Sequence, residues 1–402
     1  MSRLPDPLAL TVADYSGVQV PRYNWPLRML SDRGIRQAVA LGLIKVAPCL
    51  GDDDRIQPAT LDLSVEKIRS IQRLDERNPC HHIPAPELHM LAGCQAELIV
   101  AERISFLQDD MRSPMFFRPS ADMRSGYCRL GGFVGKQGIY GRGLSPLSDL
   151  KDSLWIGNYG PNDFIFERGD RVPQLFFYVE PFADFSFPRA GLSDKEITEL
   201  GDKVRSLEMG VQITSDEELQ AMVRESDLKI LPTVTSQNGW IIVHASEIAY
   251  RIRKLDHPIA YKDRKKFRAE LMEPIDISKG YEVKRDETVV IQMKEKFRLS
   301  PRIGIRFWDS LLETPPDLNG YRHLNPPHFS QNMNIVNLSD GWFDPGYEGI
   351  GGRQPKGLAG RIISPGDPIG FGQVFFFPKG VERPYGSDAV NSSHQGKTNL
   401  LA

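Results

Sequence analysis

The chain has 402 residues, 40% of them hydrophobic and 25% charged, so it can form two or three domains with sizeable cores. Its formal net charge of −2 gives no global basic field, which argues against binding to a nucleic-acid backbone as the main task. There is no apolar run of about eighteen residues, no C-x-x-C pair and no signal-like N-terminus, so we expect a cytoplasmic protein that does not bind membranes.

The N-terminal part predicts one helix after an irregular arm. Residues 1 to 26 contain several prolines and little periodicity, and we interpret them as the arm. Ser31 and Asp32 form a suitable N-cap for a helix over residues 33 to 43, in which apolar residues recur every four positions. Gly42 is suited to end that helix.

Short β-strands are expected through the rest of the first half. Leu61, Leu63 and Val65 alternate with polar residues, which is typical of a strand with one buried face. Residues 126 to 143 hold seven glycines and are expected to form loops or tight hairpins. Further strand patterns lie at residues 97–104, 116–120, 154–156, 164–166, 174–177 and 289–293.

One short pattern occurs twice, about two hundred residues apart. A Gly-Asp turn at residues 169–170 precedes Q-L-F-F at 174–177, and a second Gly-Asp turn at 366–367 precedes Q-V-F-F at 373–376. This repetition predicts two copies of one β-fold in the chain. The alternative is two unrelated hairpins that share common turn residues. Between them, residues 193 to 227 have helical spacing and are interpreted as a connector.

The stretch from Asp344 to Gly349, D-P-G-Y-E-G, is the first candidate site. It sets a carboxylate beside a rigid turn, with an aromatic ring between two glycines that permit positive φ. A carboxylate there can accept hydrogen bonds from a sugar hydroxyl, and Tyr347 can lie against a ring. The alternative is a plain hairpin turn.

Six short segments occur in order at the two ends of the chain, and the candidate site lies within one of them. They are L-S-D-R-G-I-R (30–36), I-Q-P-A-T-L-D-L (56–63), G-W-F-D-P-G-Y-E-G (341–349), P-G-D-P-I-G-F-G-Q-V-F-F (365–376), R-P-Y-G (383–386) and H-Q-G (394–396). Together they resemble the dCTP deaminases of the dUTPase-like superfamily, and 56–63 is the most specific match.

This resemblance and the repeat imply a mainly β fold: two dUTPase-like β-barrel or jelly-roll halves in tandem, with a few peripheral helices. The expected divisions are an arm (1–26), a first half (27–188), a helical connector (189–230) and a second half (231–402) with a C-terminal lid segment. Because single-copy relatives are trimers with sites between subunits, the resemblance implies sites between the two halves and a homo-oligomer.

Deaminases of the resembled family work without zinc, and the chain lacks the H-x-E and P-C-x-x-C motifs of zinc deaminases. Pro79 to His82 with His89 lacks the required glutamate and second cysteine, so no metal site is expected there. In the family, a glutamate on the strand after the D-P-G turn is the general base. Here Arg353 or Gln354 occupies that place, and no acid lies between Glu348 and Asp367.

The resemblance assigns roles residue by residue. Arg118 to Arg124 looks like a loosened form of the family's R-S-S-x-x-R, with a surface turn as the alternative interpretation, and Glu348 is the candidate replacement base. The predicted catalytic residues are therefore Ser120, Arg124 and Glu348. The predicted substrate-binding residues are Asp344, Tyr347, Gln373, Arg383, Tyr385, Gln395 and Lys397. No cofactor is expected except Mg²⁺ bound with the triphosphate.

Three functions remain open at this point. The first is deamination of a cytidine nucleotide, dCTP to dUTP, with Asp340, Asp344 or Glu348 as the base. The second is a dUTPase-type hydrolase of nucleoside triphosphates. The third is a nucleotide-binding or structural protein that has lost its base. Each implies a nucleoside triphosphate as substrate or ligand.

Overall fold

The computed structural model describes residues 28–48, 55–73, 88–106, 117–123, 130–134, 154–158, 160–179, 193–237, 239–264, 266–284, 287–309, 341–354, 360, 362–388, 390 and 395–401. The predicted arm at 1–26, most of the glycine-rich stretch 126–143 and all of residues 310–340 lie outside these residues. The described chain is mainly β with few helices, as predicted. None of its helices is long and apolar enough to cross a membrane.

We call the elements from β1 to β11 the first half and those from β12 to β24 the second half. The first half contains β1 (Arg28–Leu30), α2 (Asp32–Ala40), β2 (Ile44–Ala47), β3 (Leu61–Arg73), β4 (His89–Met90), β5 (Cys94–Val100), β6 (Arg103–Phe106), β7 (Phe117–Met123), β8 (Leu130–Val134), β9 (Leu154–Asn158), β10 (Phe164–Ile165) and β11 (Arg171–Val179). Helix α3 (Asp194–Arg205) follows. The second half contains β12 (Met209–Gln212), α4 (Asp216–Arg224), β13 (Leu228–Leu231), β14 (Ser236–Gln237), β15 (Trp240–Ile252), β16 (Ile259–Ala260), a 3₁₀ turn (Tyr261–Asp263), α5 (Arg268–Leu271), β17 (Met272–Asp276), β18 (Tyr281–Glu282), β19 (Val289–Leu299), β20 (Ile303–Asp309), β21 (Trp342–Phe343), β22 (Glu348–Arg353), β23 (Ile362–Ile363) and β24 (Pro368–Phe376).

The same strand pairings occur in both halves. In the first half β11 pairs with β1, β3 and β7, while β3 also pairs with β5 and β5 with β9. In the second half β24 pairs with β12, β15 and β20, while β15 also pairs with β19 and β19 with β22. Among the described strands, all pairings are antiparallel except that of β10 with β16. This repetition supports the tandem arrangement, which stays a prediction.

The starts of α2 and α4 repeat as well. Ser31 caps α2 by accepting the N–H of Gly34 at 3.0 Å, and Ser215 caps α4 in the same way at 3.2 Å. After the helices, Gly42 and Ser226 both have positive φ, 69° and 63°. The capped helix predicted near residues 33–43 is therefore confirmed, with bounds Asp32–Ala40.

The predicted connector contains more than helix. Residues 189–230 include α3, but also β12, α4 and β13, and these last three stand in the second half where β1, α2 and β2 stand in the first. The strand expected at 97–104 is divided into β5 and β6, because the Glu102 carboxylate turns inward to the backbone of Ser64 and to Arg55. The four-part division of the chain stays a prediction, with a second half that would start near β12.

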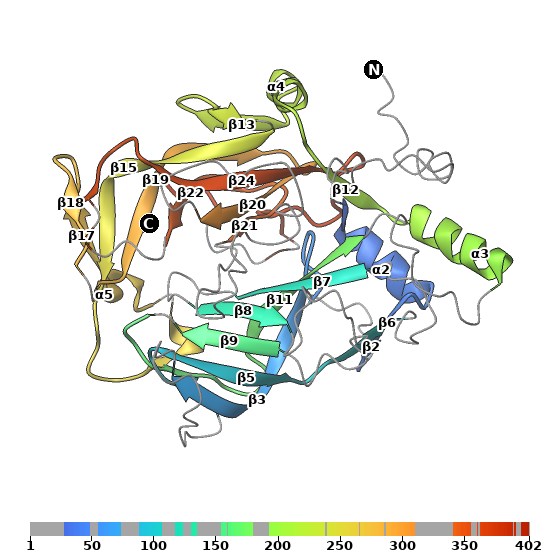
Figure 1. Cartoon of the computed structure of the whole chain (residues 1–402), viewed down its shortest axis with the longest axis horizontal. Helices are drawn as coiled ribbons and strands as arrows, with labels where there is room; N and C mark the ends of the chain where they lie inside the picture. Colours follow the sequence, from blue (N-terminus) through green and yellow to red (C-terminus); the bar gives the residue numbers. More distant parts are fainter. Residues whose placement is uncertain are drawn as a thin grey trace.

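The two halves are joined through a shared core. Figure 1 shows the strands of the first half below most of those of the second half. Strand β1 pairs with β12 between them. A separate cluster of buried residues takes members from both halves, and the Arg306 guanidinium donates a hydrogen bond to the hydroxyl of Tyr178 within it. The members of this cluster are Met29, Ala59, Phe176, Tyr178, Phe375, Phe377 and Val381.

Candidate functional site

The D-P-G-Y-E-G stretch forms a tight turn between β21 and β22. The N–H of Tyr347 donates to the carbonyl of Asp344 at 3.0 Å, and the N–H of Gly346 donates to the carbonyl of Ser300 at 3.0 Å. Gly346 has φ of 94°, and a Cβ there would lie 2.7 Å from the carbonyl oxygen of Tyr385. Glycine is therefore required at this position by its φ and by the close approach of a second segment.

The Asp344 side chain faces the junction between the halves. One carboxylate oxygen accepts a hydrogen bond from the indole N–H of Trp342 at 2.7 Å. The Trp342 ring lies 5.5 Å from the ring of Phe176 and 6.2 Å from that of Phe375, measured between centroids. The candidate sugar-binding carboxylate is thus held by a ring that contacts both halves.

Tyr347 is a core residue in this structure. Its side chain is 4% exposed, its ring stacks on Phe343 at 4.0 Å between centroids, and its hydroxyl donates to the carbonyl of Ile350 at 3.0 Å. The sequence predicted that this ring lines a pocket. The structure instead fits it into the second-half core, because Phe343 supplies a stacking partner.

The R-P-Y-G segment lies against this turn. The N–H of Tyr385 donates to the carbonyl of Pro345 at 2.8 Å, and its ring lies 5.9 Å from that of Tyr347. The Arg383 guanidinium donates to the carbonyl of Ile56 at 3.1 Å, at the start of the I-Q-P-A-T-L-D-L stretch. Two motif segments from opposite ends of the chain therefore meet here.

The C-terminal tail contacts the same turn. The Gln395 side chain accepts the N–H of Glu348 at 3.0 Å and donates to the carbonyl of Gly346 at 3.2 Å. The carbonyl of Lys397 accepts the N–H of Ile350 at 3.2 Å. We call the turn 344–349, the loop 382–386 and the tail 395–397 the turn-loop-tail cluster. It contains six of the seven predicted binding residues: Asp344, Tyr347, Arg383, Tyr385, Gln395 and Lys397.

Tail packing continues beyond the cluster. Leu400 is 1% exposed and belongs to the core cluster that contains Tyr250 and Val290, and its N–H donates to Gln292 at 3.3 Å. The sequence predicted a lid in this segment. In the structure, Leu400 near its end is buried in the core.

The structure describes the positions of two of the three predicted catalytic residues, Glu348 and Ser120. The Glu348 carboxylate lies 3.6 Å from the guanidinium of Arg298, and both side chains are partly exposed. Ser120 lies on β7 opposite Phe176 of β11. Arg124 lies outside the described residues.

The family's base position holds buried polar side chains of another kind. Arg353 is 0% exposed, with its guanidinium carbon 5.4 Å from the centroid of the Phe307 ring, and Gln354 is also buried. Gln373, predicted to bind substrate, is buried on β24 opposite Arg306 and Trp240. Arg306 in turn pairs with Trp342, two residues before Asp344, so the sheet register places Gln373 near the start of the turn.

One sequence signal was missed. Residues 124 to 129 read R-S-G-Y-C-R, which fits R-S-S-x-x-R more closely than Ser120 with Arg124 does. This segment makes Ser125 and Arg129 better candidates than Ser120. Apart from this sequence match nothing is shown for them, because the segment lies outside the described residues.

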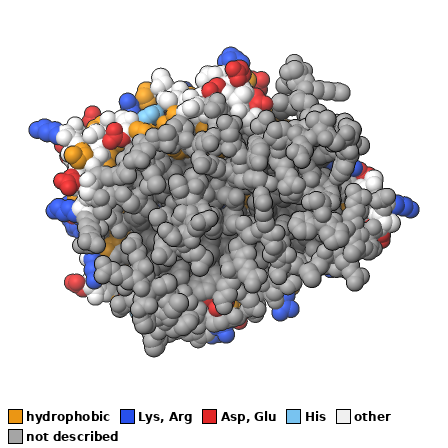
Figure 2. Space-filling view, viewed as in Figure 1, with side chains coloured by type: hydrophobic (Ala, Val, Ile, Leu, Met, Phe, Trp, Pro, Cys, Tyr) orange, Lys and Arg blue, Asp and Glu red, His pale blue; other side chains and the backbone are white. Residues whose placement is uncertain are grey.

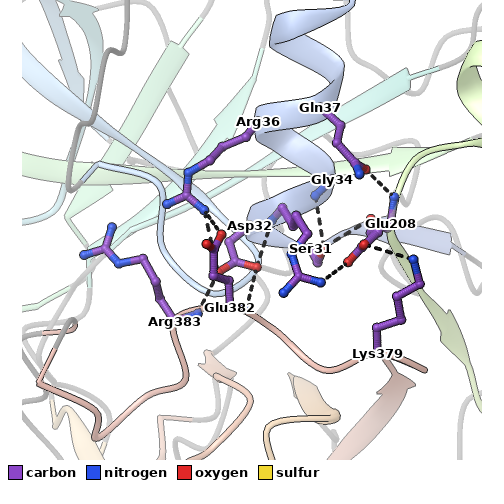
Figure 3. Close-up of polar contacts among 10 residues, drawn as sticks. Ser31, Asp32, Gly34, Arg36, Gln37, Glu208, Lys379, Glu382 and Arg383 are labelled. Atoms are coloured by element: carbon purple, nitrogen blue, oxygen red, sulfur yellow. Dashed lines mark hydrogen bonds and ion pairs between the residues drawn. The ribbon is translucent and has the colours of Figure 1, made fainter.

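The loop also contacts the start of helix α2 (Figure 3). The Asp32 carboxylate accepts the N–H groups of Glu382 at 3.1 Å and of Arg383 at 2.8 Å. Burial raises the pKa of Asp32 above its ordinary 3.8, against these two N–H groups, that of Arg33 and the Arg36 charge, which lower it. In the view of Figure 2, blue and red side chains both occur among the described residues at the edge of the molecule.

Among the described residues no three His, Cys, Asp or Glu side chains are grouped to hold a metal ion.

No protein-family model and no curated protein matches the chain. It is similar to the crystal structure of 2'-deoxycytidine 5'-triphosphate deaminase from Agrobacterium tumefaciens, with a TM-score of 0.57 and 14% identity, over 89% of this chain and 99% of that one.

This likeness supports the predicted fold. An alignment over 89% of the chain has to include both halves, so the neighbour shares the arrangement as a whole. At 14% identity the likeness extends to fold and not to reaction or substrate.

Proposed function

We propose that the protein binds a pyrimidine nucleoside triphosphate, with dCTP as the first candidate, at the turn-loop-tail cluster. The observation that carries this is the meeting of the motif segments: the loop 382–386 bonds to the turn at Pro345 and to Asp32 and Ile56 of the N-terminal motifs. Segments far apart in sequence are thereby assembled in one place, on a fold similar to that of a dCTP deaminase.

The chemistry of the cluster suits a nucleotide. Asp344 offers a carboxylate that can accept hydrogen bonds from sugar hydroxyls, and Lys397 is a cation in the tail beside the turn. A triphosphate carries several negative charges, and Mg²⁺ bound with it would reduce the charge that the protein has to balance.

The β22 strand favours binding without rapid turnover. A general base contributes about 10² to 10⁴ in rate, and the places after the turn are filled by buried Arg353 and Gln354. Glu348, the candidate replacement, is directed to Arg298 at the surface. The described residues therefore supply no carboxylate on this strand directed to a substrate.

Deamination of dCTP to dUTP is the second candidate, and the R-S-G-Y-C-R segment favours it. In that reaction an activated water attacks C4 of cytosine, and the amino group leaves as ammonia after it receives a proton. The balance is one water consumed and one ammonia released per dUTP formed. The serine and arginines would come from the first half and the turn from the second half.

Incubation with dCTP, dUTP, CTP and UTP, with ammonia and pyrophosphate measured separately, tests the proposal. We expect turnover near background, and a large gain of ammonia release in Gln354→Glu. Glu348→Gln, at the start of the strand that ends just before Gln354, is the matched change and should alter neither signal. Wild-type ammonia release that Glu348→Gln abolishes would establish the deaminase with a relocated base, and pyrophosphate release from dUTP would establish a hydrolase.

A further inference from the structure

The Asp32 carboxylate is fully buried and bonds to a segment 350 residues away. It accepts the N–H of Arg33 at 2.8 Å within its own helix, and those of Glu382 and Arg383 at 3.1 and 2.8 Å across the halves. A buried carboxylate that accepts several N–H groups fixes the backbone that carries them, because removing an acceptor leaves buried donors unpaired.

Surrounding charges reinforce this contact. The Arg36 guanidinium lies 2.8 Å from the Glu382 carboxylate and 4.0 Å from that of Asp32. The Glu208 carboxylate lies 2.8 Å from Arg33 and 3.1 Å from Lys379, just before the loop. Figure 3 shows these side chains around the first turn of α2. The loop is thus held to the first half at several points around one buried carboxylate.

The loop in turn contacts the other two parts of the turn-loop-tail cluster. Tyr385 bonds to the turn through the carbonyl of Pro345. A Cβ on Gly386 would lie 2.7 Å from the Gln395 side chain, so the loop also packs closely on the tail. A displacement of the loop would therefore move its contacts with both the turn and the tail.

The second half offers a comparison for Asp32. Asp216 follows Ser215 as Asp32 follows Ser31, at the first position of the equivalent helix. Its carboxylate accepts the N–H of Gly239 at 3.0 Å, which is only 23 residues away and in the same half. The first copy of this aspartate bonds to the loop, whereas the second bonds to Gly239 within its own half.

We propose that Asp32 is a positioning residue, which holds the loop 382–386 and thereby sets the geometry of the turn-loop-tail cluster for nucleotide binding. The inference rests on the proposed function for its ligand, but the contact itself can be tested without one. It makes helix α2 of the first half part of the binding site of the second half. Asp32 does not itself touch the ligand.

Hydrogen exchange of the full-length protein, without ligand, tests this placement. In Asp32→Asn the amide side-chain nitrogen cannot accept an N–H, so the amides of Glu382, Arg383, Tyr385 and Gly386 should exchange about tenfold faster or more. The amides of Glu348 and Ile350 should follow, while those of β3 and β11 keep their protection. Asp216→Asn is the matched control and should leave the loop, turn and tail unchanged.

Titration of the same variants with dCTP then measures the link to binding. We expect the Kd for dCTP to rise about tenfold or more in Asp32→Asn and to stay the same in Asp216→Asn. Unchanged exchange in Asp32→Asn, or equal loss in Asp216→Asn, would overturn the positioning role. If wild type binds no dCTP while the exchange result holds, the proposed function fails and the contact stands.

A wild-type measurement covers the case in which Asp32→Asn does not fold. Under mild denaturant, the amides of Glu382 and Arg383 should open together with the first turn of α2, with one shared opening free energy. Independent opening of the loop and the helix start would contradict the positioning role without any variant.

Discussion

At the scale of single residues, Asp32 combines burial with a pKa above 3.8. Its folded state therefore binds the proton more tightly than its unfolded state does. The contribution of this carboxyl group to the free energy of unfolding is highest below pH 3.8 and falls as the pH rises through the folded pKa. Above that value the contribution is constant.

This linkage gives a prediction for Asp32→Asn, which cannot titrate. The difference in unfolding free energy, wild type minus variant, should decrease as the pH rises from about 4 and then level off above the folded-state pKa. Denaturant melts of both proteins at several pH values measure it. A difference that increases with pH would show that the N–H donors and Arg36 outweigh burial and lower the pKa of Asp32.

Other residues show where sequence reasoning ends. The spacing around Ser31 predicted an N-cap, because the cap bond forms within one turn of helix. It gave no sign that Asp32 bonds to residue 383, since that contact depends on how the halves pack. The sequence predicted that Tyr347 lines a pocket. It gave no sign that Phe343 would stack on this ring, since that contact also depends on tertiary packing.

At the scale of elements, the two helix ends provide a matched pair. Gly42 and Ser226 occupy equivalent positions after α2 and α4, both with positive φ, and no heavy atom lies within 4 Å of a Cβ built on Gly42. A side chain in this conformation costs about 1 kcal/mol. Ser226→Gly should therefore raise the unfolding free energy, and Gly42→Ser should lower it, each by about 1 kcal/mol.

Thermal or denaturant melts of both single variants and the double variant check this prediction. The two sites lie in different halves, so their effects should add. Destabilisation by Ser226→Gly would mean that the serine side chain makes a contact that outweighs its backbone strain.

The C-terminal tail gives the second prediction at this scale. Leu400 is 1% exposed in the core, whereas its neighbour Leu401 is 39% exposed. Leu400→Ala should lower the unfolding free energy by about 2 to 5 kcal/mol, and Leu401→Ala should change it little. Equal, small effects in melts of both variants would show that the tail is a free lid after all.

At the scale of the whole molecule, the sequence predicted a mainly β chain with repeated elements. It could do so because strand alternation and the repeated Q-[LV]-F-F are local patterns that survive divergence. The predicted connector did not separate β12 and α4 from α3, because these elements are embedded in a charged stretch with helical spacing. Hydrophobic pattern alone does not separate a connector from the first helix of a repeat.

Assembly beyond one chain stays a prediction, as does the location of the protein in the cell. The two halves already bury a shared cluster that includes Phe176 and Phe375. A site that lies between halves can therefore be complete in one chain. The joint between Asp32 and the loop is a contact of this kind, formed by segments that the chain brings together only when both halves are folded.

Calorimetric titration of the full-length protein with dCTP and Mg²⁺ tests the central claim, nucleotide binding at the turn-loop-tail cluster, most directly. The account predicts saturable binding with a Kd between about 1 μM and 1 mM, weakened by Asp344→Asn, and no saturable heat with ATP. The absence of saturable heat with dCTP, dUTP, CTP and UTP alike, or equal binding by Asp344→Asn, would contradict it.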